Sequence, residues 1–392
     1  MKHRWIAVFL LLNWMLAAVC PALAQDGASS DTEATAEYAA LLFDDTRIHE
    51  IDLIIAEEDW ADLVQNAAQR TKYKADIIID GERFQEVSYN TKGNSSLYGV
   101  IRNYEGSSRF SLRINFGSNI KKQTYHGLRK MELNNLYGDS SCMKNFISYD
   151  LFRKAGVPSP LASFVWLKIN GRDQGLYLAL EDLGKNFLER IAGGEGVLYK
   201  PESDKLAHGG ELLPEIVKEK RQFINYGEGT ELSYRGEKVT NYHDIFEAEE
   251  EPVEEDEEDA RRVIRALYGL STGKDLDQYL DTSEIIRYFA VHNFLLNYDS
   301  YAGPMLHNYY LYERDGRLSM FPWDYNDAFG TFWALYIKGE PNDATSLANL
   351  GIDTPLLGVT AEQRPMWKWI ADNEAYLEEY HQAMDAFVSR FF

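Results

Sequence analysis

Two aspartates and an asparagine in the second half of the chain stand where predicted elements end. Asp299 follows a predicted buried helix, and Asp324 ends the second strand of a predicted hairpin that begins near His307. Asn308 opens the first strand of that hairpin. Because the hairpin joins the two carboxylates, they can face each other across a space the size of a metal ion, with Asn308 as a third oxygen ligand. Such hard oxygen ligands suit magnesium, which keeps several waters and often shares its coordination sphere with phosphates.

These residues also have a purely structural interpretation. Asp299 can cap a helix or a turn, and Asp324 can accept hydrogen bonds from backbone amides. His292 and His307 are isolated in the sequence, and a single histidine among aromatic residues is usually part of a core. No cluster of histidines and cysteines predicts a zinc site.

A short segment of the first half has the composition of a phosphate-binding loop. Lys92, Gly93, Asn94, Ser95 and Ser96 lie where a predicted strand turns into a flexible loop. Glycine and hydroxyl groups let backbone amides approach a phosphate, and lysine supplies the opposite charge. Because lysine–glycine turns are common, the segment alone is a weak indication of a phosphate site. The paired acids in the second half of the chain strengthen it. Together they are typical of nucleotide-dependent phosphoryl transfer, which needs positioning and charge neutralisation more than covalent catalysis.

Alternating apolar residues predict a β-rich first half. Residues 74–90 read as two strands joined at Asp80–Gly81, a dipeptide that favours tight hairpins. A third strand is predicted at 109–117. A helix capped by Asp139 or Ser140 follows, and then two more strands turned at Asn170–Gly171.

The second half of the chain has the periodicity of helices. Residues 281–297 give the clearest pattern, because Asp281 and Glu284 have the spacing of a capping box and apolar residues recur at three and four positions. A hairpin turned at Asp315–Gly316 follows, and the tail from Thr360 is predicted to be helical.

Composition indicates an exported globular protein. Of 392 residues, 45% are hydrophobic, which is enough to bury a large core. Residues 1–24 combine a basic start, an apolar run and Ala22-Leu23-Ala24, the pattern of a cleaved secretory signal, and residues 25–47 read as a linker. A membrane anchor is the alternative, but the apolar run is shorter than the roughly 20 residues that span a bilayer, so no stable membrane span is expected after cleavage. Cys142 would then be the only cysteine, which excludes an intrachain disulfide.

The net charge of −22 is concentrated in one run. Residues 247–259 hold ten acids in thirteen positions, which leaves 52 acids against 40 bases elsewhere. The run predicts a solvated insertion, with calcium collection or binding of a basic partner as the functional alternative. No stretch is basic enough to predict a nucleic-acid partner.

Five blocks of the sequence resemble, in this order, the CotH kinases, the spore coat protein H family. They are KGNSS, KMELNNLYGDSSCMKNFISYDLFRKAGVPSP, INGRDQGLYLALEDLGKNFLER, GVLYKPES and HNYYLY...FPWDYNDAFG. The likeness runs from about residue 48 to the end. It implies an α+β, two-lobed, divergent protein-kinase-like fold, with a β-rich N-lobe and hinge at 48–182 and a mainly helical C-lobe at 183–392. It also implies a secreted or surface-displayed kinase that uses ATP and Mg²⁺ or Mn²⁺ to phosphorylate serine or threonine in protein partners.

The resemblance implies a role for each acid. Asp299 stands at the position of the catalytic-loop acid and would orient or deprotonate the accepting hydroxyl. Asn308 and Asp324 stand at metal-binding positions and would hold the ion on the phosphates. Many members have a second acid two residues after the aspartate of Trp-Asp, where this chain has Asn326. A weaker metal contact would remain there, so metal preference or activity can differ.

The resemblance leaves the phosphate-binding cation open. Lys92 matches the lysine of KGNSS, Arg113 lies in the third predicted strand, and Lys200 follows Leu198-Tyr199. Glu181 occupies the hinge position, where neighbouring backbone groups would meet adenine and its carboxylate would fix the cleft or bind a cation.

Two other functions fit the residues. One is a non-catalytic coat, adhesion or matrix-binding protein that keeps the fold. The other is a glycan hydrolase with Asp299 and Asp324 as acid and base, which leaves the Lys92 segment unexplained. Nucleotide binding separates the kinase from both.

Overall fold

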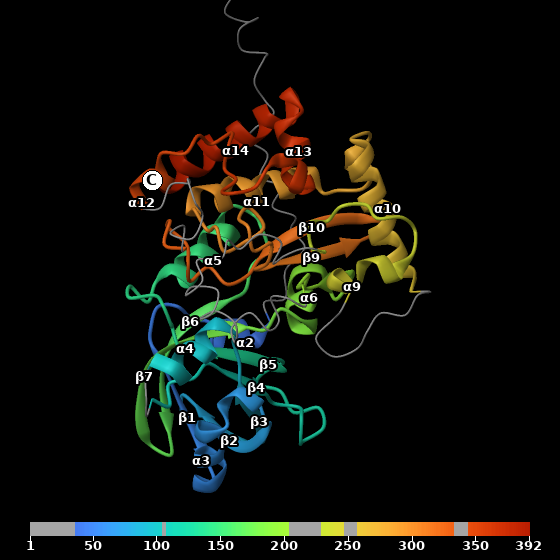
Figure 1. The fold of residues 1–392 in the computed structure, drawn as a ribbon. Coiled ribbons are helices and arrows are strands. Elements are labelled where there is room, and N and C mark those ends of the chain that lie inside the picture. Colours follow the sequence, from blue (N-terminus) through green and yellow to red (C-terminus); the bar gives the residue numbers. More distant parts are fainter. Residues whose placement is uncertain (1–35, 104–106, 204–228, 247–256, 333–343) are drawn as a thin grey trace, which may run out of the picture. The chain divides into compact units, whose positions relative to one another are not determined.

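The strands of the first half form a closed barrel. The computed structural model describes residues 36–103, 107–203, 229–246, 257–332 and 344–392, and Figure 1 labels its elements. The barrel strands are β1 (His49–Ile55), β2 (Tyr73–Ile79), β3 (Glu82–Thr91), β4 (Leu112–Asn115), β5 (Lys130–Asn134), β6 (Ala162–Ile169) and β7 (Arg172–Glu181). Their order around the barrel is β1-β2-β3-β4-β5-β7-β6.

Barrel closure overturns the fold that the resemblance implied. β1 pairs with β2 in antiparallel fashion and with β6 in parallel fashion, so that Leu53 lies opposite both Ile77 and Ile169. Every strand therefore has two neighbours, and the sheet has no open edge. The predicted two-lobed, divergent protein-kinase-like fold is wrong, although the α+β class is correct. The prediction paired strands only through local hairpins, whereas closure depends on a pairing between residues far apart in the sequence.

Alternate side chains of the barrel strands fill its interior. Ile51 and Leu53 of β1, and Ile77 of β2, are completely buried. Helices α3 (Glu57–Gln65) and α4 (Ser95–Asn103) and the 3-10 turn η1 (Ala67–Gln69) follow or separate these strands. Their buried Leu63 and Leu97 belong to the same core cluster. The period-two pattern of the sequence thus becomes a packed barrel interior.

The segment predicted as a linker contains a helix in its described part. α2 (Glu37–Leu41) lies within residues 36–47, and its Tyr38 is buried in the barrel cluster. Residues 1–35, which include the predicted signal, lie outside the described part of the chain, as do residues 247–256 of the predicted acidic insertion. Residues 36–392 form one compact unit.

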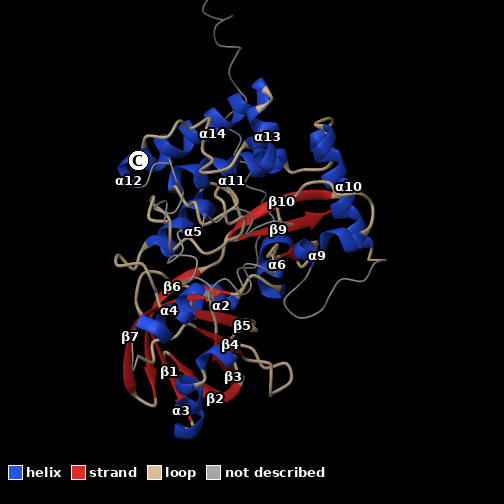
Figure 2. Ribbon diagram, viewed as in Figure 1, coloured by secondary structure: helices blue, strands red, loops and turns tan. Residues whose placement is uncertain are grey.

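Helices and a small sheet make up the rest of the described chain. The sheet has the order β10-β9-β8 and consists of β8 (Val197–Tyr199), β9 (Tyr309–Arg314) and β10 (Arg317–Pro322). Figure 2 shows the barrel strands and the β9–β10 hairpin as separate groups. The helical elements are α5 (Lys144–Lys154), α6 (Lys185–Ala192), η2 (Val239–Tyr242), α9 (His243–Phe246), α10 (Glu258–Thr272), η3 (Leu276–Gln278), α11 (Thr282–Leu295), α12 (Ala344–Ala348), η5 (Ala361–Gln363), α13 (Pro365–Ala371) and α14 (Glu374–Phe391).

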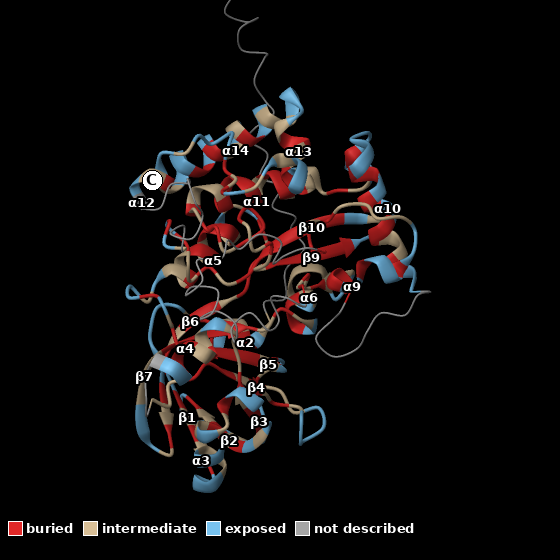
Figure 3. Cartoon of the chain, in the orientation of Figure 1, coloured by how far each residue is buried: buried red, intermediate tan, exposed pale blue. Residues whose placement is uncertain are grey.

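The β9–β10 hairpin is buried on both faces. One face contributes Leu311 and Met320 to the large core that contains α10 and α11. The other face packs Phe321 against Phe187 of α6, with ring centres 5.6 Å apart. Almost the whole hairpin is buried, as Figure 3 shows. This burial fixes the end of β10, from which the chain continues to Asp324.

The predicted helix before Asp299 is confirmed with its cap. The Asp281 carboxylate accepts the backbone N–H of Glu284 at 3.0 Å, and α11 then runs to Leu295. Leu296 ends the helix in the left-handed conformation, with φ of 51°. No helix within the described ranges is long and apolar enough to cross a membrane.

Glu284, in the first turn of α11, is expected to make stability depend on pH. Burial raises the pKa of Glu284 to about 7. A hydrogen bond with Ser319 acts in the opposite direction, but its effect is smaller than that of burial. In the unfolded chain this carboxyl has the ordinary glutamate pKa of 4.5. The free energy of unfolding therefore falls as pH rises from about 4.5 to about 7. Glutamine has no proton to lose, so Glu284→Gln avoids this decrease in stability. The Tm of the variant minus the Tm of wild type should therefore rise between about pH 4.5 and about pH 7 and then stay constant.

Thermal melts at closely spaced pH values check this expectation. Glu258→Gln, at an exposed position in the first turn of α10, is the matched control. A Tm difference between Glu284→Gln and wild type that is constant from pH 4 to 8 would contradict the raised pKa.

Candidate functional site

Asp299 is held by the residues that open the β9 hairpin. His307 Nε2 lies 2.5 Å from Oδ1 of Asp299. Asn308 Nδ2 donates to Oδ2 at 3.1 Å and to the Asp299 carbonyl at 2.8 Å. The Asp299 backbone N–H donates to Oδ1 of Asn297 at 3.2 Å. Both carboxylate oxygens are engaged, so the orientation of this side chain is fixed.

The two histidines differ from each other. His292 is buried in the core, as the sequence predicts, with Nδ1 2.6 Å from the Tyr325 hydroxyl, and burial lowers its pKa to about 3. His307 is not a core residue, because its side chain is 21% exposed and pairs with Asp299. Burial acts to lower the pKa of His307, but the Asp299 carboxylate outweighs it and holds the pKa above its ordinary value. His307 is therefore a site residue that the sequence pattern missed.

Asp324 lies two residues after the end of β10 and has a left-handed conformation, with φ of 47°. Its backbone N–H donates to the Tyr149 hydroxyl at 3.0 Å, and its carbonyl accepts from Asn297 Nδ2 at 3.3 Å. Its carboxylate makes no hydrogen bond or ion pair with any residue in the described ranges. Burial raises the pKa of Asp324; Lys92 opposes this rise, and the negative charge of Asp299 adds to it.

A third acid, Asp327, joins Asp299 and Asp324, and these three residues are termed the acid cluster. Burial raises the pKa of Asp327, and the charges of Asp299 and Asp324 raise it further, against Lys144. The Asp327 carboxylate also lacks a hydrogen-bond donor among the described side chains and amides. The charge of Asp299 therefore acts on two partly buried carboxylates, those of Asp324 and Asp327, and acids with raised pKa values of this kind mark a candidate functional site.

Asn326, the predicted second metal residue, has its contacts with other residues. Its carbonyl accepts from Lys144 Nζ at 3.1 Å. Its side-chain Nδ2 would lie 3.9 Å from a Cβ placed on Gly138. No contact between described residues joins the Asn326 side chain to the acid cluster.

The barrel brings two predicted cations to one buried carboxylate. Lys92, just after β3, forms an ion pair with Glu132 of β5, whose side chain is only 1% exposed. Arg113 of β4 lies 3.3 Å from the other Glu132 oxygen. Lys92 Nζ also lies 5.3 Å from the centre of the Trp323 ring, next to Asp324 in the chain. The sequence left the choice between Lys92 and Arg113 open, and the structure places both at Glu132.

The remainder of the KGNSS segment starts a helix rather than a flexible loop. Ser95 and Ser96 are the first residues of α4. Gly93 has φ of 95°, and a Cβ there would lie 2.3 Å from Ser96 Oγ, so only glycine fits this turn. The Asn94 carbonyl accepts the Tyr98 N–H at 3.1 Å. Lys92 is thus attached to a defined strand-to-helix turn.

Lys200, directly after β8, forms an ion pair with Glu202, with 3.4 Å between Nζ and the carboxylate. The charge of Glu202 contributes to the raised pKa of His307. No contact between described residues joins Lys200 itself to the acid cluster.

Glu181 is instead part of the barrel framework. It is the last residue of β7, is fully buried, and is paired in register with Met131 of β5. Arg190 and the Tyr38 hydroxyl each donate to its carboxylate at 2.6 Å. These bonds attach α6 and α2 to the barrel, and no contact among the described residues joins Glu181 to the acid cluster.

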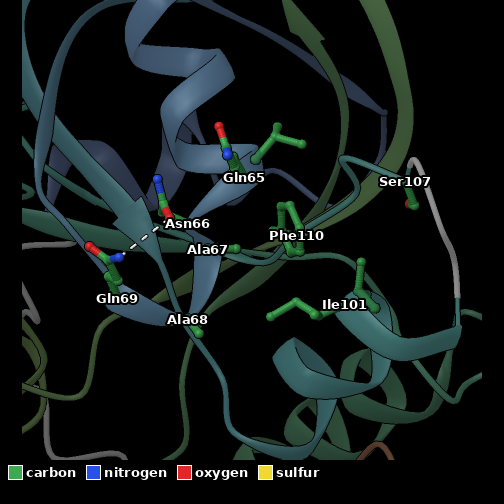
Figure 4. A pocket seen from close by; sticks show the side chains of 10 residues that line it. Gln65, Asn66, Ala67, Ala68, Gln69, Ile101, Ser107 and Phe110 are labelled. Carbon is green, nitrogen blue, oxygen red and sulfur yellow. Dashed lines mark hydrogen bonds between the residues drawn. The ribbon is translucent and has the colours of Figure 1, made fainter.

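A separate pocket of about 280 Å³ lies between α3, η1, α4 and the residues before β4 (Figure 4). Its lining is Val64, Gln65, Asn66, Ala67, Ala68, Gln69, Val100, Ile101, Ser107 and Phe110. None of the predicted site residues lines it. The acid cluster is therefore identified by its charges and contacts rather than by the size of a cavity.

Removal of the Glu132 carboxylate is expected to destabilise the barrel. Glu132→Ala leaves Lys92 and Arg113 without their shared buried partner, and breaking such a pair costs about 3 kcal/mol or more of unfolding free energy. Urea unfolding measures the change. The control is Glu86→Ala, whose pair with Lys74 is more than half exposed on both sides and should contribute less than about 1 kcal/mol. Equal losses for the two variants would contradict the buried pairing.

Comparisons with known proteins place this chain in a family. Residues 90–392 match the family described as "CotH kinase protein", a range that contains every predicted site residue. Inner spore coat protein H of Bacillus subtilis (strain 168) is 28% identical over 235 residues, 59% of this chain and 58% of that protein. The inner spore coat protein H-like protein of the same organism is 39% identical over 56 residues, 14% of this chain and 18% of that protein. The chain thus aligns with less than two thirds of either relative's length. The family match confirms the resemblance read from the five sequence blocks, and the chain belongs to the CotH family.

Proposed function

We propose that this protein is an exported, metal-dependent protein kinase that transfers the γ-phosphate of ATP to serine or threonine hydroxyls of protein partners. The observation that supports this proposal is the electrostatic contact between Lys92 of the barrel and the acid cluster after β10. Phosphoryl transfer needs a cation for the phosphates, oxygen ligands for a metal and an acid beside the accepting hydroxyl. We assign Lys92 and Arg113 to the phosphates, Asp324 and Asp327 to the metal, and Asp299 to the accepting hydroxyl.

The residues fit a hard divalent cation such as Mg²⁺ or Mn²⁺. The carboxylates of Asp324 and Asp327 are partly buried without a hydrogen-bond donor from the described residues, and a cation would offset the cost of their charge. Within the same ranges no group of three or more histidine, cysteine, aspartate or glutamate side chains converges on one ion position. Magnesium commonly takes one or two carboxylates and completes its sphere with water and phosphates. Bound there, the ion would neutralise charge on the phosphates.

We assign the metal ligands to Asp324, Asp327 and the side-chain oxygen of Asn308. Asn308 uses its amide nitrogen to hold Asp299, which leaves its oxygen for the ion. Asp327 takes the place predicted for Asn326, because the Asn326 side chain lies by Gly138.

Asp299 suits the role of the residue that receives or orients the accepting hydroxyl. Its two oxygens are hydrogen-bonded to His307 and Asn308, so its direction is set before a substrate arrives. The hydroxyl oxygen would attack the γ-phosphorus, the bond to the β–γ bridging oxygen would break, and ADP would leave. The hydroxyl proton would pass to Asp299. Lys92 and Arg113, kept together by Glu132, would provide positive charge for the phosphates.

Location and partner follow from the sequence and the relatives. Residues 1–24 predict export, and the relatives are named as inner spore coat proteins. We therefore propose that the protein acts outside the cytoplasm, at a cell surface or in a periplasm, on protein components found there.

A second candidate is a coat or adhesion protein without catalytic activity. The relatives' names favour it, since they describe a coat component. The test is incubation of the full chain with γ-³²P-ATP, Mn²⁺ or Mg²⁺, and dephosphorylated casein, followed by phosphoamino-acid analysis. Metal-dependent label on serine or threonine, in casein or in the chain itself, supports the kinase. Absence of label together with absence of ATP binding in a folded sample supports the coat protein.

A further inference from the structure

The backbone of Asp324 has a conformation that residues other than glycine rarely adopt. Its φ of 47° lies in the left-handed region. A residue remains in such a conformation only where its surroundings fix it, and residues of this kind cluster at functional sites. The contact that fixes the Asp324 amide comes from helix α5.

Two buried side chains of α5 bind consecutive backbone amides after β10. The Tyr149 hydroxyl accepts the N–H of Asp324 at 3.0 Å. Asn145 Oδ1 accepts the N–H of Tyr325 at 2.6 Å. Positions 145 and 149 are four apart, so both side chains lie on the same face of the helix. They are 2% and 0% exposed respectively, so both acceptor side chains are shielded from water.

Neighbouring contacts hold this arrangement rigid. The Tyr325 ring packs edge-on against Phe152 of α5, with ring centres 5.2 Å apart. Lys144, at the start of α5, donates to the Asn326 carbonyl at 3.1 Å. The start of the helix is itself fixed, because the Lys144 backbone N–H donates to the Asp139 carboxylate at 2.9 Å. The segment 324–326 is therefore held residue by residue.

The position of α5 in the chain connects the two halves of the site. α5 lies between barrel strands β5 and β6. β5 carries Glu132, which binds Lys92 and Arg113. The helix that fixes Asp324 thus belongs to the same stretch of chain as the carboxylate that fixes the cations.

We propose that Tyr149 and Asn145 are positioning residues of the acid cluster: they hold Asp324 in the left-handed conformation that directs its carboxylate toward the metal. The hydrogen bonds that Tyr149 and Asn145 accept from the backbone are contacts in the structure. Their role in orienting a metal ligand rests on the proposed function, in which Asp324 binds a metal. Side chains that orient metal ligands without touching the metal affect affinity about 10- to 100-fold.

The test is Tyr149→Phe, which removes one hydroxyl and keeps the ring. Selective ¹⁵N-aspartate labelling of the metal-free full chain reports amide exchange, and the Asp324 signal is assigned by its loss in Asp324→Asn. We expect exchange of the Asp324 amide to become about tenfold faster. We also expect Mn²⁺-dependent ATP binding, measured by calorimetry, to weaken about tenfold or more. Asn145→Ala, which removes the neighbouring acceptor, should have the same two effects.

Tyr89→Phe is the control, because Tyr89 is also completely buried and its hydroxyl has no hydrogen-bond partner in the described part of the chain. It should change neither readout. If wild type binds Mn²⁺ and ATP while Tyr149→Phe binds them equally well, the inference is overturned, whatever the amide exchange does. If wild type binds neither but the Asp324 amide exchanges faster in Tyr149→Phe, the hold on the backbone stands and the proposed function fails.

Discussion

Asp324→Asn is expected to abolish metal-dependent phosphate transfer while the protein stays folded. The substitution removes one of the two carboxylates of the acid cluster that lack a hydrogen-bond donor among the described residues, and with it much of the negative charge that would attract the ion. Charge stabilisation by a bound metal contributes several kcal/mol to catalysis. At about 1.4 kcal/mol for each factor of ten, kcat/KM should fall about a thousandfold or more. Initial rates with γ-³²P-ATP and Mn²⁺ measure the loss.

The same substitution should not lower stability at neutral pH. Burial raises the pKa of Asp324, so the folded state disfavours the charged form. For such a group, stability is highest below the unfolded pKa and falls as pH rises through the folded pKa. Asparagine carries no charge, so the variant avoids this decrease in stability. The Tm of Asp324→Asn at pH 7 should therefore equal or exceed that of wild type. Asp385→Asn, at an exposed position in α14, is the matched control for both measurements. Wild-type transfer by Asp324→Asn would remove Asp324 from the metal site.

Asp299→Asn is expected to lower kcat by about a thousandfold with little change in nucleotide affinity. General acid–base groups contribute about 10²- to 10⁴-fold. Asparagine keeps an oxygen for Asn308 or His307 but cannot accept the hydroxyl proton as a carboxylate does. A loss in kcat without a loss in binding indicates an interaction made in the transition state. Calorimetric Kd values for ATP with Mn²⁺, measured beside kcat, separate the two effects.

The pair of variants tests the division of roles within the acid cluster. Asp324→Asn should weaken metal-dependent ATP binding, whereas Asp299→Asn should leave it within about twofold. If Asp299→Asn instead abolishes binding and Asp324→Asn does not, the metal ligand and the proton acceptor have been assigned the wrong way round.

Local turn chemistry explains the parts of the fold that the sequence predicts well. Asp80–Gly81, Asn170–Gly171 and Asp315–Gly316 all have positive φ at both residues, the conformation that tight hairpins require. Each turn joins two strands that are confirmed, namely β2 to β3, β6 to β7, and β9 to β10. The α11 cap at Asp281 succeeded for the same reason, because all of its contacts are local.

Barrel closure was missed because it depends on residues distant in the sequence. The parallel pairing of residues 49–53 with residues 165–169 leaves no mark on either strand, since each has the same alternation in an open sheet. β5 was missed for a different reason. It is only five residues long, Lys130–Asn134, so its alternation of polar and apolar residues covers just two apolar positions, Met131 and Leu133.

The candidate site was predicted best where a hairpin brings residues together. Asn308 and Asp299, which were predicted to lie beside one metal-sized space, hydrogen-bond each other. Glu132 was missed, although a charged residue between buried Met131 and Leu133 is itself a signal of a buried ion pair. His307 was missed because single histidines were treated as core residues, and its place next to Asn308 was the available signal.

Calorimetric titration of ATP into the full chain, with and without Mn²⁺ or Mg²⁺, tests the central claim most directly. We expect ATP binding that requires the metal and that Asp324→Asn removes. No binding under any metal condition, in a sample whose cooperative thermal melt shows that it is folded, would contradict a nucleotide site at the acid cluster.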